Sequence, residues 1–596
     1  MKKDTRSLSI LTAMRRTFPL IAKQAPMALT AHIFLLVLTG FLSGIMTPAT
    51  ERVFNSLADA VLGDGTARTV YFALLLKGGI LVSRVLIGSI HGNLLGQYMY
   101  TRMDGALSFI AHEKFARLPA QLFEDKEMLD NMEKSRNGMN SAIQMLFTFT
   151  QMLFSTGVYF VVMGIYLWQM QPVLLAALSL VFIPVALSQI IQARIKAQQQ
   201  DYLAPLKRVE GRYNKHAKNE TETRIFGVFN HFNALQLSAR RLIFAKEWEV
   251  RKKVQLIEFG LNLTKVAGWV GIVLLLYRGL MAGNVTVGAF AAVFAAIGTM
   301  FSQFESIFSQ IQQSASNQLG AIHHFIDFLD LPESTEGDGT PPDFNQGGIV
   351  ASSITFRYPA AEKAAVDGVS LTIRKGETIA IVGENGSGKT TLVKLLCGLY
   401  KPDEGNVTIG GRDTVKTSDT SLFSATTAVF QNFNNYKPLN LGDNVRVSNL
   451  KNSADIESAL KAAEVDYTDE ATFPKGLESL MGREFDGTEI SKGQWQRIAM
   501  ARGMYREHEI IILDEPTAAI DPLEETRVYN RFAEYAKDKT AILVTHRLGS
   551  ARIADRIIVM DGGKIVESGK HEDLLAKGGK YAEMWMAQAE WYNYGI

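Results

Sequence analysis

The sequence predicts a membrane bundle of six α-helical spans followed by a soluble α/β domain with a phosphate-binding loop. Three observations lead to this fold class. Most long apolar runs of the 596-residue chain come before residue 312. A glycine-rich turn at 383–391 joins a strand-like run to a helix-like run. Further along, the apolar run 510–513 ends in two acidic residues, which is typical of a strand buried in a parallel sheet.

Length and composition limit the classes of protein to which the chain can belong. Its 596 residues exceed what one hydrophobic core can organise, so several domains are expected. The formal net charge of +2 gives no electrostatic reason to expect a nucleic acid as partner. The single cysteine, Cys397, cannot form an internal disulfide, and this fits a reducing compartment.

Residues 1–25 are expected to form a short region before the spans begin. Residues 5–24 have the pattern of an amphipathic helix lying along the membrane surface, with a flexible tail as the alternative. The first apolar run begins near Met27 behind a basic stretch with no small-residue cleavage site, so no secretory signal is expected. The apolar side of the predicted helix holds Leu8, Ile10, Leu11, Phe18, Leu20 and Ile21.

The domain 26–330 contains six segments that are apolar enough for spans of about 20 residues each. Ionisable residues inside spans are costly unless they face the bundle interior or a wet cavity. Lys77, Arg84, Lys265 and Glu305 are therefore candidate pathway residues, with snorkelling or an intramembrane ion pair as the alternative. The predicted spans lie near 28–48, 69–92, 144–168, 172–193, 260–281 and 285–310.

Charge places the two long loops of this domain in the cytoplasm. The stretches 93–143 and 194–259 are rich in Lys and Arg, whereas the loops on the opposite side hold few of either. Both stretches have apolar residues at helical spacing and little Gly or Pro. We therefore expect the spans to continue as helices into the cytoplasm and to turn near 120–132 and 211–224.

A linker at 331–348, rich in Asp, Gly, Pro and Thr, leads to the soluble domain at 349–596. In its glycine-rich turn, residues without Cβ atoms let backbone N–H groups approach phosphates, and the following helix adds its positive N-terminus. Lys389 is expected to reach the β- and γ-phosphates, and the Thr390 hydroxyl to ligate Mg²⁺. The residues of the turn are Gly383, Glu384, Asn385, Gly386, Ser387, Gly388, Lys389, Thr390 and Thr391.

Two carboxylates follow the predicted strand at 510–513. Ligands of parallel sheets bind at the carboxyl ends of the strands, so Asp514 is placed to hold Mg²⁺, directly or through water. Glu515 is placed to polarise an attacking water. An acidic strand end that caps the next helix is the alternative, and the phosphate-binding loop argues against it.

Further polar residues fit a nucleotide site. Tyr358 offers an aromatic face on which a nucleobase could stack, although such residues often belong to the core. Gln431 and His546 each follow a predicted strand, and His546 could contact a γ-phosphate. The turn Ser491–Gln494 opens a helix and forms a second anion-binding N-terminus. Because one γ-phosphate rarely needs two such sites, a head-to-tail dimer is expected, in which each turn meets the partner's phosphates.

This set of motifs, in this order, resembles the nucleotide-binding domain of an ATP-binding cassette (ABC) transporter, and the whole chain resembles an exporter-type half-transporter. The resemblance implies that the soluble domain is a P-loop ATPase that uses ATP and Mg²⁺. It further implies the following roles: Tyr358 as the adenine-stacking aromatic, 383–391 as the Walker A loop, Gln431 as the Mg²⁺-sensing glutamine, Ser491, Gly493 and Gln494 as the signature, Asp514 as the Walker B aspartate, Glu515 as the catalytic base, Asp521 as the D-loop aspartate and His546 as the switch histidine. The turns near 120–132 and 211–224 would be coupling helices that dock on the ATPase domains.

The signature departs from the pattern of the family. Ile490 replaces the usual Leu, and Lys492 replaces the first Gly of Leu-Ser-Gly-Gly-Gln. Because the signature serves the partner's ATP, this change concerns the site in trans and not this chain's own Walker set. A second copy of the chain is favoured as the partner by the general preference for symmetric assemblies, and a heterodimer with a different half-transporter is the alternative.

The resemblance implies ATP-driven export with alternating access across a lipid bilayer. Spans rich in Phe, Met and Leu suit a hydrophobic or amphipathic peptide, lipid or drug, although such residues also simply face lipid. An importer or other pump, or a non-pumping regulator that couples ATP to a signal, is the rival interpretation. A base at Glu515 argues against a regulator, since a protein that only binds ATP needs none. A bacterial inner membrane is the expected location.

Overall fold

The structure is a computed structural model that describes residues 9–219, 221–314, 318–334, 337–359, 361–451, 455–515 and 532–593. The chain divides into two compact units. We call Met1–Phe115 together with Asp130–Leu331 the helical unit, and Ala116–Leu129 together with Pro332–Ile596 the α/β unit. The segment 116–129 thus groups with the α/β unit, although the sequence placed it between two spans.

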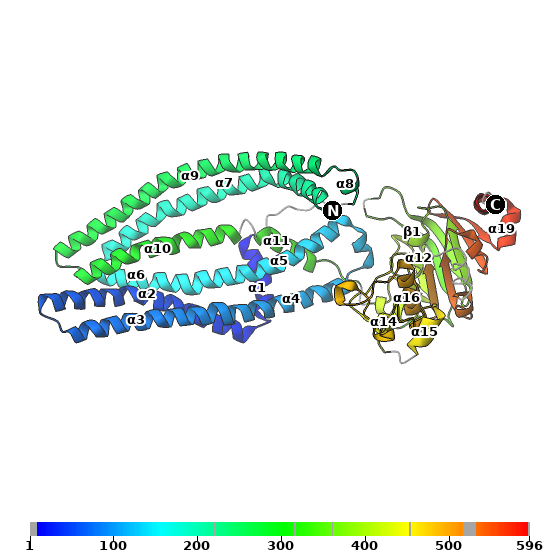
Figure 1. Ribbon diagram of the computed structural model, residues 1–596, viewed down its shortest axis with the longest axis horizontal. Coiled ribbons are helices and arrows are strands. Elements are labelled where there is room, and N and C mark those ends of the chain that lie inside the picture. The colour runs from blue at the N-terminus through cyan, green and yellow to red at the C-terminus, as the bar shows by residue number, and fades with distance from the viewer. Residues whose placement is uncertain are drawn as a thin grey trace. The chain divides into compact units, whose positions relative to one another are not determined.

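The helical unit consists of long helices, of which α7 and α9 lie side by side (Figure 1). Among the described residues, six helical stretches are long and apolar enough to cross a membrane, which confirms the predicted number. Each predicted span overlaps one of them. The helices are α1 (Ile10–Ala22), α2 (Pro26–Leu62), α3 (Ala67–Ser89), π-helix η1 (Ile90–Gly96), α4 (Gln97–Arg117), α5 (Lys126–Thr150), π-helix η3 (Gln151–Thr156), α6 (Gly157–Met170), α7 (Pro172–Asn219), α8 (Thr221–Ile225), α9 (Phe229–Met281), α10 (Val287–Gln313) and α11 (Leu319–Leu329).

The spans continue as long helices, and the chain reverses direction near the two predicted turns. The first reversal holds the short 3-10 helix η2, Ala120–Glu124, and is shorter than predicted because α5 already begins at Lys126. The second holds α8 and starts later than predicted, because α7 stays helical to Asn219. A single residue such as Gly211 costs a helix only about 1 kcal/mol, which the packing of α7 against α9 offsets.

Two glycines on α2 set how closely it approaches the neighbouring helices. A Cβ atom at Gly40 would lie 2.3 Å from the carbonyl oxygen of Ser155 on η3, and one at Gly44 would lie 2.6 Å from the side chain of Val162 on α6. The spacing of four residues puts both glycines on one face of α2. This is the small-residue contact by which helices in membranes approach backbone to backbone.

The N-terminal helix α1 packs against α11 rather than lying free. The Arg16 guanidinium donates to both carboxylate oxygens of Asp330 at 2.6 Å. Of the residues predicted for its apolar side, Ile21 is buried, Leu11 is 77% exposed and Leu8 lies outside the described residues. The buried residues of α1 are Ala13, Thr17 and Ile21, so only Ile21 of the predicted apolar side is fully buried.

The four ionisable residues predicted within spans fall into two groups. Lys77 and Arg84 lie on α3, where Arg84 is exposed. Lys265 on α9 and Glu305 on α10 form an ion pair at 2.6 Å, so the alternative of an intramembrane ion pair holds for these two. The pair ties α9 to α10.

The α/β unit is built on two sheets. A four-stranded antiparallel sheet has the order β2-β1-β4-β5, and a six-stranded sheet has the order β10-β9-β3-β8-β7-β6. The strands are β1 (Ile349–Phe356), β2 (Val366–Ile373), β3 (Thr378–Gly383), β4 (Glu404–Ile409), β5 (Arg412–Asp413), β6 (Thr426–Val429), β7 (Ile510–Asp514), β8 (Thr540–Val544), β9 (Arg556–Asp561) and β10 (Lys564–Gly569). The described helices are α12 (Lys389–Leu396), α13 (Asp419–Ser424), α14 (Leu441–Arg446), α15 (Ile456–Ala462), the 3-10 helices η5 (Gly476–Glu478) and η6 (Arg483–Phe485), α16 (Lys492–Tyr505), α18 (Leu548–Ala551), α19 (His571–Lys577) and α20 (Lys580–Asn593).

The parallel strands of the second sheet bring four loops to one edge. β3, β8, β7 and β6 are neighbours and run in the same direction. β7 and β8 are buried along their whole length, because helices cover both faces of such a sheet. The segments that follow these strands therefore meet at their carboxyl ends, where ligands of open α/β sheets bind.

Candidate nucleotide-binding site

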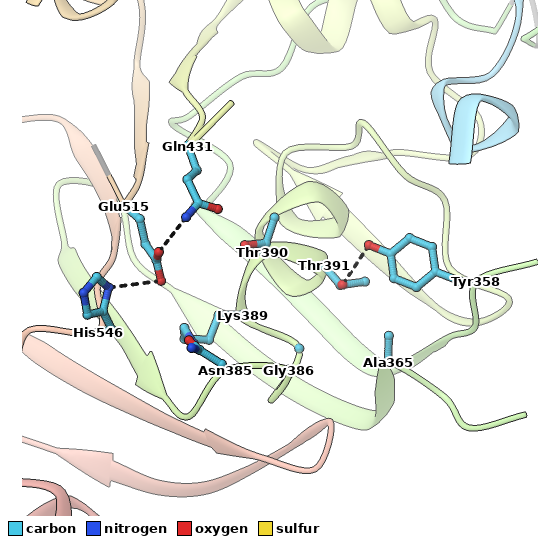
Figure 2. A pocket seen from close by; sticks show the side chains of 11 residues that line it. Tyr358, Ala365, Asn385, Gly386, Lys389, Thr390, Thr391, Gln431, Glu515 and His546 are labelled. Atoms are coloured by element: carbon cyan, nitrogen blue, oxygen red, sulfur yellow. Dashed lines mark hydrogen bonds and ion pairs between the residues drawn. The ribbon is translucent and has the colours of Figure 1, made fainter. Parts of the chain in front are cut away.

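A cavity of about 730 Å³ lies where these loops meet. It takes residues from the glycine-rich turn after β3 and from the segments that follow β6, β7 and β8 (Figure 2). Its volume is in the range of pockets for small molecules and cofactors. The residues that line it are Tyr358, Ala365, Asn385, Gly386, Gly388, Lys389, Thr390, Thr391, Gln431, Glu515 and His546.

The glycine-rich turn has a backbone that only glycine accommodates at its tightest points. Gly388 has φ +101°, and a Cβ atom there would lie 2.2 Å from the carbonyl oxygen of Ala365. The turn wraps the ammonium of Lys389, which donates to the carbonyl oxygens of Gly383 and Glu384 at 2.9 Å each. Burial lowers the pKa of Lys389, and the nearby carboxylates of Glu515 and Asp514 oppose that shift. The loop thus holds a cation against the cavity wall.

Asp514 ends β7 as a buried carboxylate with unused bonding capacity. Its side chain is 1% exposed, and Oδ1 accepts a hydrogen bond from the Thr390 hydroxyl at 3.2 Å. Its Oδ2 atom is buried without a partner among the described residues. Burial raises the pKa of Asp514 to about 6. A carboxylate and a hydroxyl that converge beside the phosphate loop are oxygen ligands of the kind Mg²⁺ prefers, so these residues fit that ion.

Glu515 follows at once and stands between two polar partners. Gln431 Nε2 donates to Glu515 Oε2 at 3.0 Å, and His546 Nδ1 lies 3.5 Å from Glu515 Oε1 (Figure 2). Glu515 has φ +46°, a left-handed conformation that is uncommon for a residue with a side chain. The hydrogen bond between His546 and Glu515 lowers the pKa of the glutamate and raises the pKa of the histidine. The Glu515 carboxylate is therefore kept ionised, and it lines the cavity at the edge of the sheet.

Tyr358 lines the cavity just beyond the end of β1. Its hydroxyl and that of Thr391 are 3.0 Å apart, and its ring packs edge-on against Phe356 with centroids 5.3 Å apart. In Figure 2 it lies across the phosphate loop from Glu515. Tyr358 thus packs against the hydrophobic core and also borders the cavity. Its position fits both a core residue and a residue on which a nucleobase could stack.

The signature residues do not line this cavity. They open α16, where Ser491 Oγ accepts from the Gln494 amide at 3.2 Å and Gln494 Oε1 accepts from the Ser491 amide at 2.8 Å. This reciprocal capping box, with Gly493 between them, leaves Lys492 exposed in the first turn of α16. Asp521, the remaining predicted site residue, lies outside the described residues.

Comparisons with known proteins place this site in a family. A family model described as "ABC transporter" matches residues 366–518, which include the phosphate loop, the signature and Asp514–Glu515. The subtilin transport ATP-binding protein SpaT of Bacillus subtilis is 27% identical over 606 residues, covering 97% of this chain and 94% of that protein. This chain belongs to the ABC transporters. It has the exporter-type half-transporter arrangement, with the transmembrane part fused to the nucleotide-binding domain, as predicted.

Other relatives match about half of their own length. The ATP-dependent lipid A-core flippase of Methylobacillus flagellatus is 34% identical over 344 residues, covering 56% of this chain and 57% of that protein. The mycobactin import ATP-binding/permease protein IrtB of Mycolicibacterium smegmatis is 33% identical over 310 residues, covering 52% and 53%. A solved structure of a bacterial Atm1-family ABC exporter with ATP bound has a TM-score of 0.76 at 22% identity, covering 95% of this chain and 98% of that one, and it shows that the fold is shared.

As an ABC transporter, the chain is an integral membrane ATPase that couples ATP binding and hydrolysis to transport. The comparisons support ATP-driven export as its general activity.

Sequence reasoning missed two side chains of the C-terminal helix that hold loops of the site. Lys580 forms an ion pair with Glu384 of the phosphate loop at 2.8 Å. Gln588 donates to the carbonyl oxygen of His546 at 2.5 Å and accepts from the Leu548 amide at 3.0 Å. Both residues lie on α20, 65 to 74 residues beyond Asp514–Glu515 and in no motif, so no local pattern marked them. The helix thereby braces the phosphate loop and the loop of His546.

The short helix η2 contacts the helix that begins at the phosphate loop. Within the α/β unit, the carboxylate of Glu124 accepts from the Tyr400 hydroxyl and, at 3.1 Å, from the Lys394 ammonium on α12. Lys394 also lies 4.8 Å from the centre of the Tyr400 ring. The hydrogen bond from Tyr400, joined by Lys394, lowers the pKa of Glu124. The segment between α4 and α5 is thus attached to α12 at Lys394, about one helical turn beyond Lys389.

Proposed function

We propose that this chain exports a hydrophobic or amphipathic substrate, a peptide, lipid or drug, as one half of a dimeric ABC exporter. Relatives are named for subtilin transport, for a lipid A-core flippase and for mycobactin import, so a peptide and a lipid are among the cargoes of similar proteins. The described spans are long, apolar and poor in charge. The single observation that carries the catalytic part is Glu515, held between Gln431 and His546 at the rim of the phosphate loop.

The proposed roles follow the geometry of the cavity. The glycine-rich turn and Lys389 bind the phosphates of ATP, and Tyr358 stacks on the base. Thr390, Gln431 and Asp514 hold Mg²⁺, which supplies charge neutralisation at the phosphates. Two buried oxygen atoms support this binding of phosphate and Mg²⁺. Asp514 Oδ2 and Ser387 Oγ have no hydrogen-bond partner among the described residues.

Glu515 acts as the general base in this proposal. Its lowered pKa keeps it ionised near neutral pH, so it can accept a proton from an attacking water. His546 orients the carboxylate and lies where it can contact a γ-phosphate. The left-handed backbone conformation of Glu515 is strained, and such strain is commonly found at active sites.

The partner is proposed to be a second copy of the chain, with a heterodimer as the alternative. The turn Ser491–Gln494 does not border this chain's own cavity, so it is available to a nucleotide bound by the partner. Asp521 is proposed to lie at the same dimer contact. ATP binding closes the two ATPase domains and hydrolysis reopens them, so that the spans alternate between two states. Glu124, attached to α12, is proposed to transmit that motion.

The proposed location is a bacterial inner membrane with the α/β unit in the cytoplasm. The basic residues of 93–143 and 194–259 support this orientation through the positive-inside rule. One of the relatives is named as an importer, so the direction of transport has to be measured. A non-pumping regulator remains the rival, and an activated carboxylate at Glu515 argues against it.

The test is ATP-dependent movement of a fluorescent phosphatidylethanolamine and a fluorescent hydrophobic peptide in proteoliposomes. Only chains with the ATPase domain outside can use added ATP, so the sign of the movement reports direction. The proposal predicts movement out of the ATP-facing side by wild type and at least a 100-fold loss in Glu515→Gln. Glu509→Gln is the matched control, because Glu509 lies before the opposite end of β7 and outside the cavity. Equal movement by Glu515→Gln and wild type would contradict the proposal.

A further inference from the structure

A small polar cavity lies in the helical unit, apart from the nucleotide site. Its volume is about 110 Å³, enough for a few water molecules or one small polar group. Three helices build it, namely α7, α9 and α10. Seven of its eight lining residues carry polar side chains, which are Ser188, Gln189, Gln192, Glu258, Asn262, Lys265 and Glu305, and the eighth is Val185.

The lining residues occupy one stretch of each helix, from Val185, about 20 Å from the Pro172 end of α7, to Glu258, about 35 Å from the Met281 end of α9. At 1.5 Å per residue, Gln189, Lys265 and Glu305 lie about 24–27 Å from the Pro172, Met281 and Val287 ends of their helices. With the proposed orientation, these ends are on the outer side, so the cavity lies near the cytoplasmic boundary of a hydrocarbon core about 30 Å thick. Polar groups at that depth are costly and mark ligand or ion pathways.

The charges of the cavity do not balance. Lys265 and Glu305 neutralise each other at 2.6 Å. Glu258 accepts only an amide hydrogen bond, from Gln255 Nε2 at 3.2 Å, and no described cation pairs with it. Two carboxylates and one ammonium leave a formal charge of −1.

The neutral groups add acceptors and an apolar wall. Gln189 and Asn262 have no hydrogen-bond partner among the described residues, so their amide oxygens are open to a donor. Val185 belongs both to the cavity wall and to the apolar core of this unit. That core contains the stacked rings of Phe182 and Phe304, whose centroids are 4.1 Å apart. Acceptors and net negative charge thus sit beside aromatic surface.

We infer that this cavity binds the primary ammonium group of a ligand with a hydrophobic body. An ammonium brings three N–H donors and one positive charge, which matches the excess carboxylate and the open amide oxygens. The apolar part of the ligand extends along the core next to Val185. This inference rests on the proposed export function and specifies its substrate class as amphipathic amines.

A charge series in the cavity tests the inference by direct binding. The probe is radiolabelled dodecylamine, added without ATP to the full-length protein in phosphatidylcholine nanodiscs, with dodecanol as the uncharged competitor. We expect saturable binding that dodecanol does not displace. Glu258→Gln removes the net charge and is expected to weaken binding at least tenfold. Lys265→Gln raises the charge to −2 and is expected to tighten binding at least threefold.

A double variant separates ligand binding from a structural clamp between α9 and α10. Lys265→Gln combined with Glu305→Gln removes the ion pair but restores the net charge of −1 through Glu258. The inference predicts binding within about threefold of wild type for this variant, because the net charge is unchanged. A purely structural clamp predicts instead that the double variant loses the most probe binding of all the variants. Glu249→Gln, on the exposed cytoplasmic part of α9 and outside the cavity, is the matched control and should bind like wild type.

Displacement of the bound probe identifies the source of the ammonium group. Lysophosphatidylethanolamine offers it on a lipid, and a short hydrophobic peptide with a free N-terminus offers it on a peptide, with the N-acetylated peptide as control. Displacement by one of them assigns the class of source. If neither displaces the probe, the assignment of the cavity to the exported ligand is overturned.

Failure of this inference is distinguishable from failure of the proposed function. Dodecylamine binding that is absent, or that ignores the charge series, overturns the ammonium site, while Glu515-dependent transport in proteoliposomes leaves the exporter standing. Binding that follows the charge series in a protein that moves no substrate keeps the site and overturns export.

Discussion

The nucleotide cavity and the polar cavity of the helical unit are built in opposite ways. The first takes its side chains from loops at the ends of neighbouring parallel strands, and most of these residues lie in short sequence motifs. The second takes one or a few residues from each of three long helices, with no motif at any of them. Chemistry imposed by a strand–loop–helix geometry therefore leaves a local pattern in the sequence, whereas a site assembled by helix packing does not.

The sharpest test of the first region removes the cation that its loop wraps. Lys389→Ala is expected to lower ATP affinity at least 100-fold, because the buried ammonium is positioned for the phosphates and nothing else replaces its charge. Equilibrium binding of a fluorescent ATP analogue measures this. Lys375→Ala, an exposed lysine on the turn before β3, should bind as wild type does. Similar losses in both variants would mean that overall charge, and not this loop, holds the nucleotide.

Asp514→Asn is expected to separate stability from activity. The folded state raises the pKa of Asp514 from 3.8 to about 6, so ionisation destabilises the nucleotide-free protein as pH rises through that window. The shift corresponds to a cost on the order of 3 kcal/mol at neutral pH, which a neutral amide removes. We expect Asp514→Asn to melt several degrees higher than wild type at pH 7.5, with the difference gone below about pH 4, and to lose ATPase activity. A lower melting temperature at pH 7.5 would contradict this.

The same carboxylate predicts a pH dependence of metal-assisted binding. Below pH 6 Asp514 is mostly protonated in the nucleotide-free protein, so Mg²⁺ must displace a proton. From pH 7.5 to 5.0, the affinity for Mg²⁺-ATP is expected to fall about tenfold more in wild type than in Asp514→Asn, whose remaining slope reports the titration of ATP itself. Isothermal calorimetry measures both slopes, and parallel slopes would remove Asp514 from the metal site.

These two regions also show how far sequence alone reaches. The six spans, the sheet strands and nearly all of the nucleotide cavity were predictable, because apolar length and glycine-rich phosphate loops are local signals. The contact of Glu515 with both Gln431 and His546 depends on strand order, which no single stretch encodes. The ion pair of Lys265 with Glu305 was one of two open alternatives, because helix rotation within a bundle is set by packing. The stripe of α1 that is buried depends in the same way on α11.

A smaller effect is expected at the contact between η2 and α12. Glu124→Gln keeps the shape of the side chain but weakens its bonds with Tyr400 and Lys394. We expect transport per ATP hydrolysed to fall about threefold to tenfold, with ATP affinity unchanged, in proteoliposomes. Glu133→Gln, which changes an exposed carboxylate on α5, is the control. A loss of ATP affinity in Glu124→Gln would mean that the contact supports the phosphate loop rather than coupling.

The smallest effect is expected at α20, which no motif marks. Gln588→Ala removes two hydrogen bonds that hold the loop of His546, and it should reduce the ATPase rate about twofold to fivefold without changing the affinity for ATP. Gln588→Glu restores acceptance from Leu548 but not donation to His546, so it should fall between Gln588→Ala and wild type. An unchanged rate in Gln588→Ala would show that the brace does not position His546.

We propose that this chain carries a complete set of ATP-hydrolysing residues but needs a partner's signature turn to use them. We would measure ATP hydrolysis by the chain expressed alone, in lipid nanodiscs separated by mass into those with one copy and those with two. We expect hydrolysis only in two-copy nanodiscs, and we expect Glu515→Gln to abolish it. A single-copy nanodisc that hydrolyses ATP at the same rate per chain would contradict this proposal.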